Sequence, residues 1–210
     1  MAHGGTEANL FAAYLGRERY PDAVLYASAE AHYSIPKITR LLRLPHVAVD
    51  TGADGAMSLD ALVREVRVRS DRAAVVVATV GSTGRGAMDD AHRIRRVVSK
   101  AGVHRVFIHS DAAFGGMLAA FGRPPRPWAF ADGADSVSIS GAQDHRLAGA
   151  QQRRPGPLRG RAVGSDDDTI SGSRDALSPV LLWYALRGLG REGLARRIHR
   201  CLEVTDHAIR

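Results

Sequence analysis

Residues 106–116 read VFIHSDAAFGG, and this stretch decides the fold class. A short apolar run leads to a carboxylate, Asp111, and then to small residues interrupted only by Phe114. Such a run is typical of a parallel strand buried on both faces, and ligands of α/β proteins bind beyond the carboxyl ends of such strands. Asp111 therefore stands where a binding site is expected, although an aspartate at this place can equally cap the helix that follows.

Further apolar runs and helical patterns alternate on either side of this stretch. The predicted strands are residues 23–26, 46–49, 74–78, 106–109 and 136–139. The predicted helices are residues 9–16, 33–42, 58–69 and 89–100. Ser58 and Asp89 are suitable N-caps, and Gly102 is a suitable stop. The alternation predicts an α/β fold with a mostly parallel sheet and helices on both faces.

The pattern breaks off over residues 142–163, which have neither helical nor strand periodicity. Two more helices are predicted over 177–189 and 192–209. We expect residues 1–190 to be a partial large domain and 191–210 the start of a truncated C-terminal helix or small domain. Both ends of the sequence read as cuts through a longer protein.

The composition is that of an ordinary globular chain with one odd feature, its charge. Its 210 residues, 45% of them apolar, allow a sizeable buried core. No apolar run is long enough for a membrane helix, no secretory signal is visible and the single Cys201 excludes an internal disulfide, so we expect a cytoplasmic protein. The net charge of +7 favours a polyanionic partner, but no recognised nucleic-acid motif accompanies it.

Three further loops could carry chemistry, although each is a weak signal alone. Gly4-Gly5-Thr6 runs into a predicted helix, and the exposed N–H groups of a helix start suit a phosphate. His32 and the loop 81–86, GSTGRG, each follow a predicted strand. Together with Asp111 these loops fall at equivalent ends of strands or at a helix start, so we expect them to meet in one site. No metal site is expected.

In this order the stretches resemble the pyridoxal-phosphate-dependent group II amino-acid decarboxylases of fold type I. The matching stretches are GGTEANL, YPDAVLYASAEAHYSIPKITRLL, DGAMSLDAL, VGSTGRGAMDD, HSDAAFGGML, FADGADSVSISG and TISGSRDALSPVLLW. The likeness is greatest to the histidine decarboxylase branch, which also contains plant serine decarboxylases. The resemblance implies a fold-type-I large domain, a carboxy-lyase acting on a small amino acid, pyridoxal 5′-phosphate as cofactor, and a homodimer without membrane or nucleic-acid partner.

The resemblance also implies roles for particular residues. Gly5 and Thr6 would help to hold the cofactor phosphate, while His32 and Ala113 would flank the pyridine ring. Asp111 would face the ring nitrogen and keep it protonated, which stabilises the electron pair left when CO2 departs. His32 and Asp111 are thus the candidate catalytic residues. The other candidate cofactor-binding residues are Thr83, His109 and Ser140, and residues 172–174 would belong to a loop near the site.

The motif that should supply the Schiff-base lysine is disrupted. In the family a Ser-x-His-Lys motif follows the strand that corresponds to residues 136–140. Here Ser140-Gly141 is followed by Ala142 and Gln143. Gln143 occupies the lysine position, and an amide cannot form a Schiff base. The chain's two lysines lie in predicted helices away from the site, so we expect the chain as written to be inactive.

Composition alone would make residues 142–163 a solvated basic loop, but a shift of reading frame offers another explanation. Back-translation from Ala142, with the frame moved forward by one nucleotide, permits His-Lys-x-x-Gly-Ser-Pro-Val-Pro. This resembles the family's continuation after the strand. We hypothesise a frameshift that begins near Gly141 and is compensated before Thr169, either a sequencing error or a genuine lesion. The block holds five arginines and one aspartate, so it supplies +4 of the net charge.

Three other functions stay open on the sequence. The chain could be an inactive remnant, a basic polyanion-binding protein, or another fold-type-I enzyme that catalyses transamination or desulfuration. Nucleic-acid binding would be salt-dependent, and the charge of the irregular block is its main support. The contexts of His32 and of the loop 81–86 favour a decarboxylase over the other enzymes.

Overall fold

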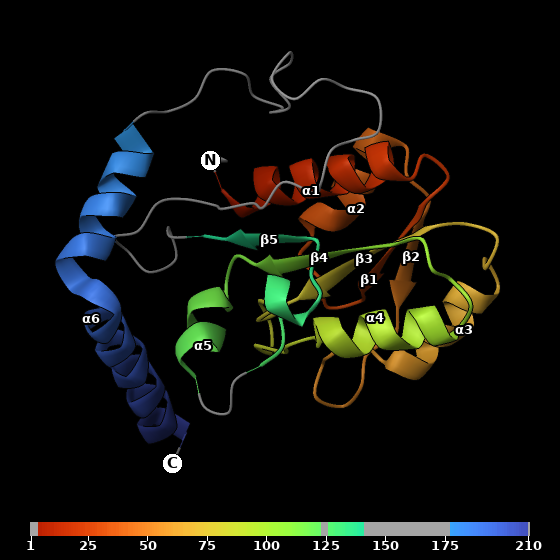
Figure 1. Ribbon diagram of the computed structural model, residues 1–210. Coiled ribbons are helices and arrows are strands. Elements are labelled where there is room, and N and C mark those ends of the chain that lie inside the picture. The colour runs from red at the N-terminus through yellow and green to blue at the C-terminus, as the bar shows by residue number, and fades with distance from the viewer. Residues whose placement is uncertain (1–3, 123–125, 141–176, 210) are drawn as a thin grey trace.

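The structure is a computed structural model, and it describes residues 4–122, 126–140 and 177–209 (Figure 1). Five parallel strands form one sheet in the order β2-β1-β3-β4-β5. The strands are β1 (Val24–Ser28), β2 (His46–Val49), β3 (Ala74–Thr79), β4 (Val106–Ala112) and β5 (Ser136–Ile139). The predicted α/β fold and parallel sheet are therefore confirmed.

Helices cover both faces of this sheet, as predicted (Figure 1). α1 and α2 pack on one face, and α3 and α4 pack on the other. The helices are α1 (Gly5–Arg19), α2 (Ser34–Leu42), α3 (Leu59–Arg67), α4 (Ala91–Lys100), α5 (Gly116–Phe121) and α6 (Leu177–Ile209), with a short 3-10 helix, η1 (Phe130–Asp132).

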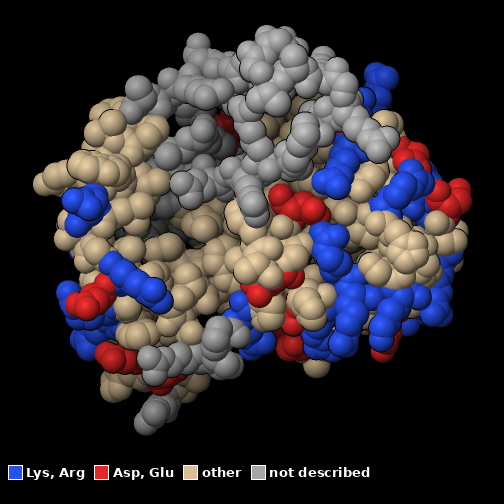
Figure 2. Space-filling view, viewed as in Figure 1, with Lys and Arg blue, Asp and Glu red and all other residues tan. Residues whose placement is uncertain are grey.

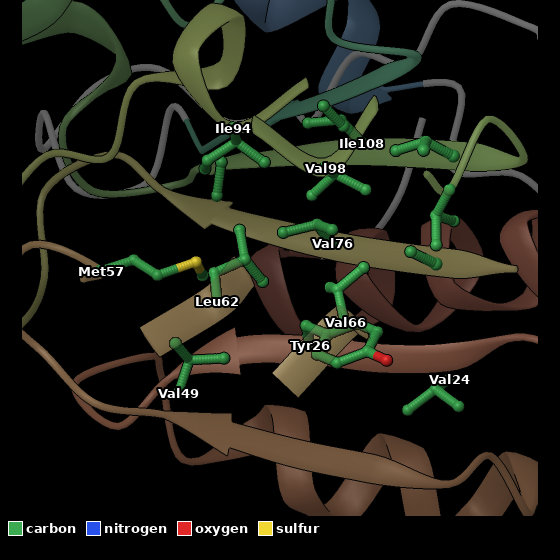
Figure 3. Packing of buried hydrophobic residues seen from close by; sticks show 14 of the residues in the cluster. Val24, Tyr26, Val49, Met57, Leu62, Val66, Val76, Ile94, Val98 and Ile108 are labelled. Carbon is green, nitrogen blue, oxygen red and sulfur yellow. The ribbon is translucent and has the colours of Figure 1, made fainter. Parts of the chain in front are cut away.

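The strands carry apolar side chains on both faces because helices cover both. Tyr26, Val76 and Ile108 point toward α3 and α4, where they join Leu62 and Ile94 in one cluster (Figure 3). The alternate residues of the same strands, Leu25, Val75 and Phe107 among them, join the cluster under α1 and α2. Alternation along a strand thus divides the core into two layers, and the central strands are apolar where both layers cover them. Buried polar residues of β4 begin only at His109, toward its carboxyl end.

The ends of two elements differ from the prediction in ways that matter for the site. α1 begins at Gly5, well before residue 9, and no side chain caps it. β4 continues through Ala112, so Asp111 lies inside the strand and does not cap a helix. α4 is capped by Asp90, whose side chain accepts from the Arg93 N–H, and not by Asp89. Asp89 points inward instead.

Two short elements were not predicted, and one long element joins two that were. α5 and η1 are too short for apolar periodicity to reveal them. α6 unites the predicted helices 177–189 and 192–209, but the backbone at Gly190 is not helical, with φ 62°. Its second half packs against α5, with Leu194 and Ile198 buried and His199 Nε2 3.0 Å from the Phe121 carbonyl oxygen.

Several expectations lie outside the described residues. They are the irregular block 142–163, the lysine position Gln143 and the loop 172–174. Within the described ranges, no helix is both long and apolar enough to cross a membrane.

Candidate active site

A cavity of about 240 Å³ opens at the carboxyl ends of the strands. It adjoins the point where the strand order reverses, between β1 and β3, which is where open α/β sheets bind ligands. Its lining comes from the start of α1, the loops after β1, β3 and β5, and the end of β4. The lining residues are Gly5, Thr6, Asn9, His32, Tyr33, Thr79, Gly81, Ser82, Thr83, Asp111, Ala113, Phe114 and Ser140.

The fold brings almost all of the residues expected at a cofactor site to this cavity. The expected residues that line it are Gly5, Thr6, His32, Thr83, Asp111, Ala113 and Ser140. His109 is the exception: it was expected to line the site, but its ring is 1% exposed and lies behind the cavity wall. The reason is strand alternation, since His109 and Asp111 share one face of β4 but His109 lies two residues deeper into the sheet.

The N-terminus of α1 forms one wall. Gly5 and Thr6 line the cavity, and Gly4, at φ 150°, caps the helix without a side-chain hydrogen bond. A Cβ on Gly5 would lie 2.8 Å from the Ala113 Cβ, so a glycine is required for this close approach. An uncapped helix start beside an open cavity suits an anion such as a phosphate.

Asp111 is held by donors from three directions. Its Oδ2 accepts a 2.6 Å hydrogen bond from Asn9 Nδ2, and its Oδ1 accepts from the Ala113 N–H at 3.2 Å and the Ser138 hydroxyl at 3.4 Å. The residue is 6% exposed. This geometry fixes a carboxylate at the floor of the cavity, where it can accept a hydrogen bond from a cationic ligand group.

His109 forms a buried layer beneath Asp111. Its Nε2 lies 2.9 Å from Asn9 Oδ1, and its Nδ1 lies 2.8 Å from the Ser136 hydroxyl. Burial lowers the pKa of His109 to about 4, against the smaller opposing effect of the Asp111 charge. The imidazole is therefore neutral at physiological pH, and it supports Asn9 and Asp111 without facing the cavity.

His32 lines the cavity from the loop after β1. Its Nδ1 receives the Ser34 N–H at 3.3 Å and lies 2.8 Å from the Ser34 hydroxyl. A ring nitrogen that accepts from a backbone N–H carries no proton, so in the neutral ring the proton is on Nε2. The Tyr33 ring packs beside it, with ring centroids 4.1 Å apart.

The loop after β3 is held close to the start of α5. Gly81, at φ 85°, lies against Gly115, and a Cβ on Gly115 would lie 2.4 Å from the Val80 carbonyl oxygen. Behind the loop, Asp89 accepts from the backbone N–H groups of Met57 at 2.7 Å and Thr79 at 2.8 Å. These contacts position Ser82 and Thr83 at the cavity.

Four lining residues were not given a role from the sequence: Asn9, Tyr33, Thr79 and Phe114. Asn9 had a usable signal, because it lies one helical turn after Gly5 and Thr6 and so shares their face of α1. Thr79 had no sequence signal, because nothing in the sequence distinguishes it from any other threonine at the end of a buried strand.

Comparison with known proteins agrees with this geometry. The pyridoxal-dependent decarboxylase conserved domain matches residues 17–151, more than half of the chain. The chain belongs to the pyridoxal-dependent decarboxylase family. Membership confirms the predicted family and its cofactor, pyridoxal phosphate, and the match ends inside the irregular block.

Two relatives support the expected branch of this decarboxylase family. Histidine decarboxylase of Mesorhizobium japonicum is 40% identical over 212 residues, which cover 96% of this chain and 57% of the relative. Histidine decarboxylase of Klebsiella aerogenes is 35% identical over 222 residues, which cover 100% of this chain and 58% of the relative. The chain thus spans a little over half the length of these relatives.

A solved structure shares the fold of this chain. The crystal structure of mouse CSAD superposes with a TM-score of 0.80 at 26% identity, over 99% of this chain and 51% of that one. The fold-type-I architecture is confirmed by this likeness.

The cavity fits pyridoxal phosphate in its non-covalent contacts. Within the described residues the Thr79 hydroxyl oxygen is buried without a hydrogen-bond partner, and Thr79 lines the cavity, so a bound polar group would satisfy it. The covalent contact does not fit. Lys37 is exposed, with its Nζ 4.8 Å from the centroid of the Tyr33 ring, and Lys100 ends α4 at a distance from the cavity wall.

Proposed function

We propose that the chain is the cofactor-binding part of a pyridoxal-phosphate-dependent amino-acid decarboxylase of the histidine decarboxylase type. The observation that carries the proposal is one cavity that joins the uncapped start of α1, the His32 ring and the Asp111 carboxylate. These groups suit a phosphate, an aromatic ring and a protonated ring nitrogen, which are the three recognisable parts of the cofactor.

Each part of the cofactor has residues suited to hold it. The backbone N–H groups at Gly5 and Thr6, with the Thr83 hydroxyl, would bind the phosphate. His32 and Ala113 would flank the ring, and Asp111 would hold the proton at the ring nitrogen. When bound, the cofactor accepts the electron pair that remains when the substrate loses CO2. Asp111 would stabilise the positive charge of a protonated ring nitrogen.

The chain as written would hold the cofactor reversibly and would not turn over. Gln143 stands where the family has its lysine, and the exposed Lys37 has no place in the cavity lining. Histidine is the proposed substrate of the full-length protein because the relatives are named for it. A cytoplasmic homodimer is the proposed setting, and sedimentation of the purified chain would test the dimer.

Titration with pyridoxal phosphate, followed by borohydride reduction, tests the proposal. We expect a saturable change in the cofactor absorbance that gel filtration reverses, and no covalent label after reduction. Asp111→Asn should weaken binding by about 10- to 100-fold, the equivalent of one hydrogen bond to a charged group. Lys37→Arg is the control and should bind as the parent chain does.

Two results would count against this reading. Absence of saturable binding would refute the cofactor site. A reduction-stable label that Lys37→Arg abolishes would show that Lys37 forms the covalent bond, contrary to the proposed reversible binding.

A further inference from the structure

A buried row of hydrogen-bonded polar side chains runs from the interior of the sheet to the cavity and ends at Asp111. Its members, in order, are Ser136, His109, Asn9 and Asp111. All are buried, and Asn9 is 2% exposed. Ser136 and His109 are register partners on β5 and β4, whereas Asn9 comes from α1. Asn9 is therefore the link between the helix and the sheet at this site.

The Asn9 amide fits in one orientation only. Its Nδ2 lies 2.6 Å from Asp111 Oδ2, and its Oδ1 lies 2.9 Å from His109 Nε2. With nitrogen and oxygen exchanged, the amide oxygen would meet a carboxylate oxygen at that distance, and an ionised carboxylate can only accept. Asn9 therefore donates to Asp111 and accepts from His109.

It follows that His109 carries its proton on Nε2. The ring is neutral, so one nitrogen donates and the other accepts. The Nε2–H donates to Asn9, and the bare Nδ1 accepts from the Ser136 hydroxyl at 2.8 Å. The Ser138 hydroxyl lies 3.0 Å from Asn9 Oδ1 and 3.4 Å from Asp111 Oδ1, and it can donate its one proton to either oxygen but not to both. The Asp111 carboxylate thus sets the direction of each hydrogen bond from Ser136 through His109 and Asn9.

Asp111 still has room for another donor. An ionised carboxylate offers about four acceptor positions. The donors that reach Asp111 are Asn9 Nδ2 and the Ala113 N–H, with the Ser138 hydroxyl shared between Asp111 and Asn9. Because Asp111 also lines the cavity, its remaining acceptor position is available to a ligand there.

We propose that Asn9 is a positioning residue, which orients Asp111 and holds His109 in its neutral Nε2–H form so that Asp111 accepts a hydrogen bond from a protonated ring nitrogen. The proposal rests on the proposed function, because the ring nitrogen belongs to the cofactor. In this proposal Asn9 acts through Asp111, the carboxylate that would face the ring nitrogen. A residue of purely structural importance would change folding stability but not the protonation of a bound ring.

Pyridoxamine 5′-phosphate labelled with an NMR-active isotope at its ring nitrogen is a suitable probe, because it has the cofactor's ring and phosphate and needs no lysine. In the parent chain, we expect the bound ring nitrogen to remain protonated at a pH where the free compound has lost that proton. Asn9→Ala should lower affinity by about 10- to 100-fold and release the ring proton at lower pH. Leu15→Val is the matched control: Leu15 is a buried residue of the same helix outside the row of polar side chains.

The possible outcomes distinguish failure of the positioning role of Asn9 from failure of the cofactor site itself. If Asn9→Ala binds the probe with unchanged affinity and ring protonation, Asn9 has no positioning role and the cofactor site stands. If the parent chain binds no probe, the proposed function fails. NMR of the ring nitrogens of His109 in the parent chain needs no variant: a proton on Nε2 supports the proposal, and a proton on Nδ1 overturns it.

Discussion

Asp89 shows how one buried carboxylate can hold a site together without touching it. It joins the loop before α3 to the end of β3 through the N–H groups of Met57 and Thr79. Burial raises its pKa to about 6. The residue next to it, Asp90, caps α4. Two adjacent aspartates therefore have different tasks.

Asp89→Asn should destabilise the fold by about 1–3 kcal/mol, because the amide NH2 must face a backbone N–H and leave it unsatisfied. Asp90→Asn is the matched control and should change stability little, since asparagine caps a helix as well as aspartate does. Urea unfolding of the two variants measures the difference. Equal stabilities would contradict the assignment of Asp89 as the inward-facing residue.

His109 predicts a pH dependence of stability with a definite sign. Its pKa is lowered from 6.5 to about 4 in the folded chain. Between pH 6.5 and about 4 the unfolded chain binds a proton at His109 that the folded chain does not. The free energy of unfolding is therefore unaffected by the protonation of His109 above about pH 6.5 and decreases as the pH falls toward about 4. The loss should be on the order of 3 kcal/mol, from about 1.4 kcal/mol per pKa unit.

His109→Gln should lack this acid-side decline, although its stability near neutral pH should be lower because of the altered packing. The difference between the two unfolding curves across pH isolates the effect. Asp89, whose pKa is raised, changes the free energy of unfolding with pH in the opposite direction. This effect is the same in the parent chain and in His109→Gln, so it cancels in the difference. Parallel curves would show that His109 does not titrate differently on folding.

The residues of the site differ in how far the sequence could reveal them. Asp111 and His32 were accessible because their loops fall at equivalent ends of predicted strands and match a known family, although each signal was weak alone. Asn9 was overlooked since its importance depends on three partners, and the nearest of them in sequence, His109, is 100 positions away. Asp89 was wrongly predicted to cap α4 because two adjacent aspartates before a helix are equivalent N-cap candidates in the sequence. Only the structure shows that Asp90 caps the helix and Asp89 is buried.

Among the elements, the strands were predictable and the short helices were not. A strand buried on both faces is mostly apolar, so a short apolar run reveals it. α5 is short, and its position depends on the contact between Gly115 and the loop that begins at Gly81. This contact joins two loops at the cavity, and glycine is needed on both sides of it.

Gly115→Ala should therefore destabilise the chain and weaken cofactor binding together. Its Cβ would meet the Val80 carbonyl oxygen at 2.4 Å, a backbone atom that can move only if the loop moves. We expect a loss of at least 1–3 kcal/mol, about the cost of overpacking a core. Thermal unfolding and pyridoxal phosphate titration provide the two measurements.

Gly188→Ala is the control for that substitution. Gly188 lies in α6 with open space around its Cβ position, so alanine should stabilise the helix by about 0.5–1 kcal/mol. Normal cofactor binding by Gly115→Ala would show that the two loops do not depend on each other.

The net positive charge of the molecule first suggests a polyanionic partner, but the frameshift hypothesis explains much of it differently. Figure 2 shows lysines and arginines gathered toward the α3 and α4 side of this face, with acidic residues among them. Much of the net charge of +7 comes from residues 142–163, which the frameshift hypothesis treats as mistranslated. The polyanion-binding alternative loses its main support if that hypothesis holds.

Sequencing the gene across codons 140–169 is the direct measurement. We expect two compensating frame changes, between which the restored frame encodes His-Lys after Gly141. The chain expressed from the restored frame should gain a borohydride-stable pyridoxal phosphate label at the new lysine. An unbroken frame that encodes Gln143 would refute a sequencing error and leave a genuine lesion.

The cavity draws its walls from residues between Gly5 and Ser140, contributed by five separate segments of the chain. The cavity needs α1 and the ends of β1, β3, β4 and β5 in place together, so a ligand that binds there binds the folded state. By mass action such a ligand adds about 2.7 kcal/mol to stability at one hundred times its dissociation constant. Even without the Schiff-base lysine, the cofactor would therefore act as a folding ligand, and its concentration would affect how well this chain resists proteolysis.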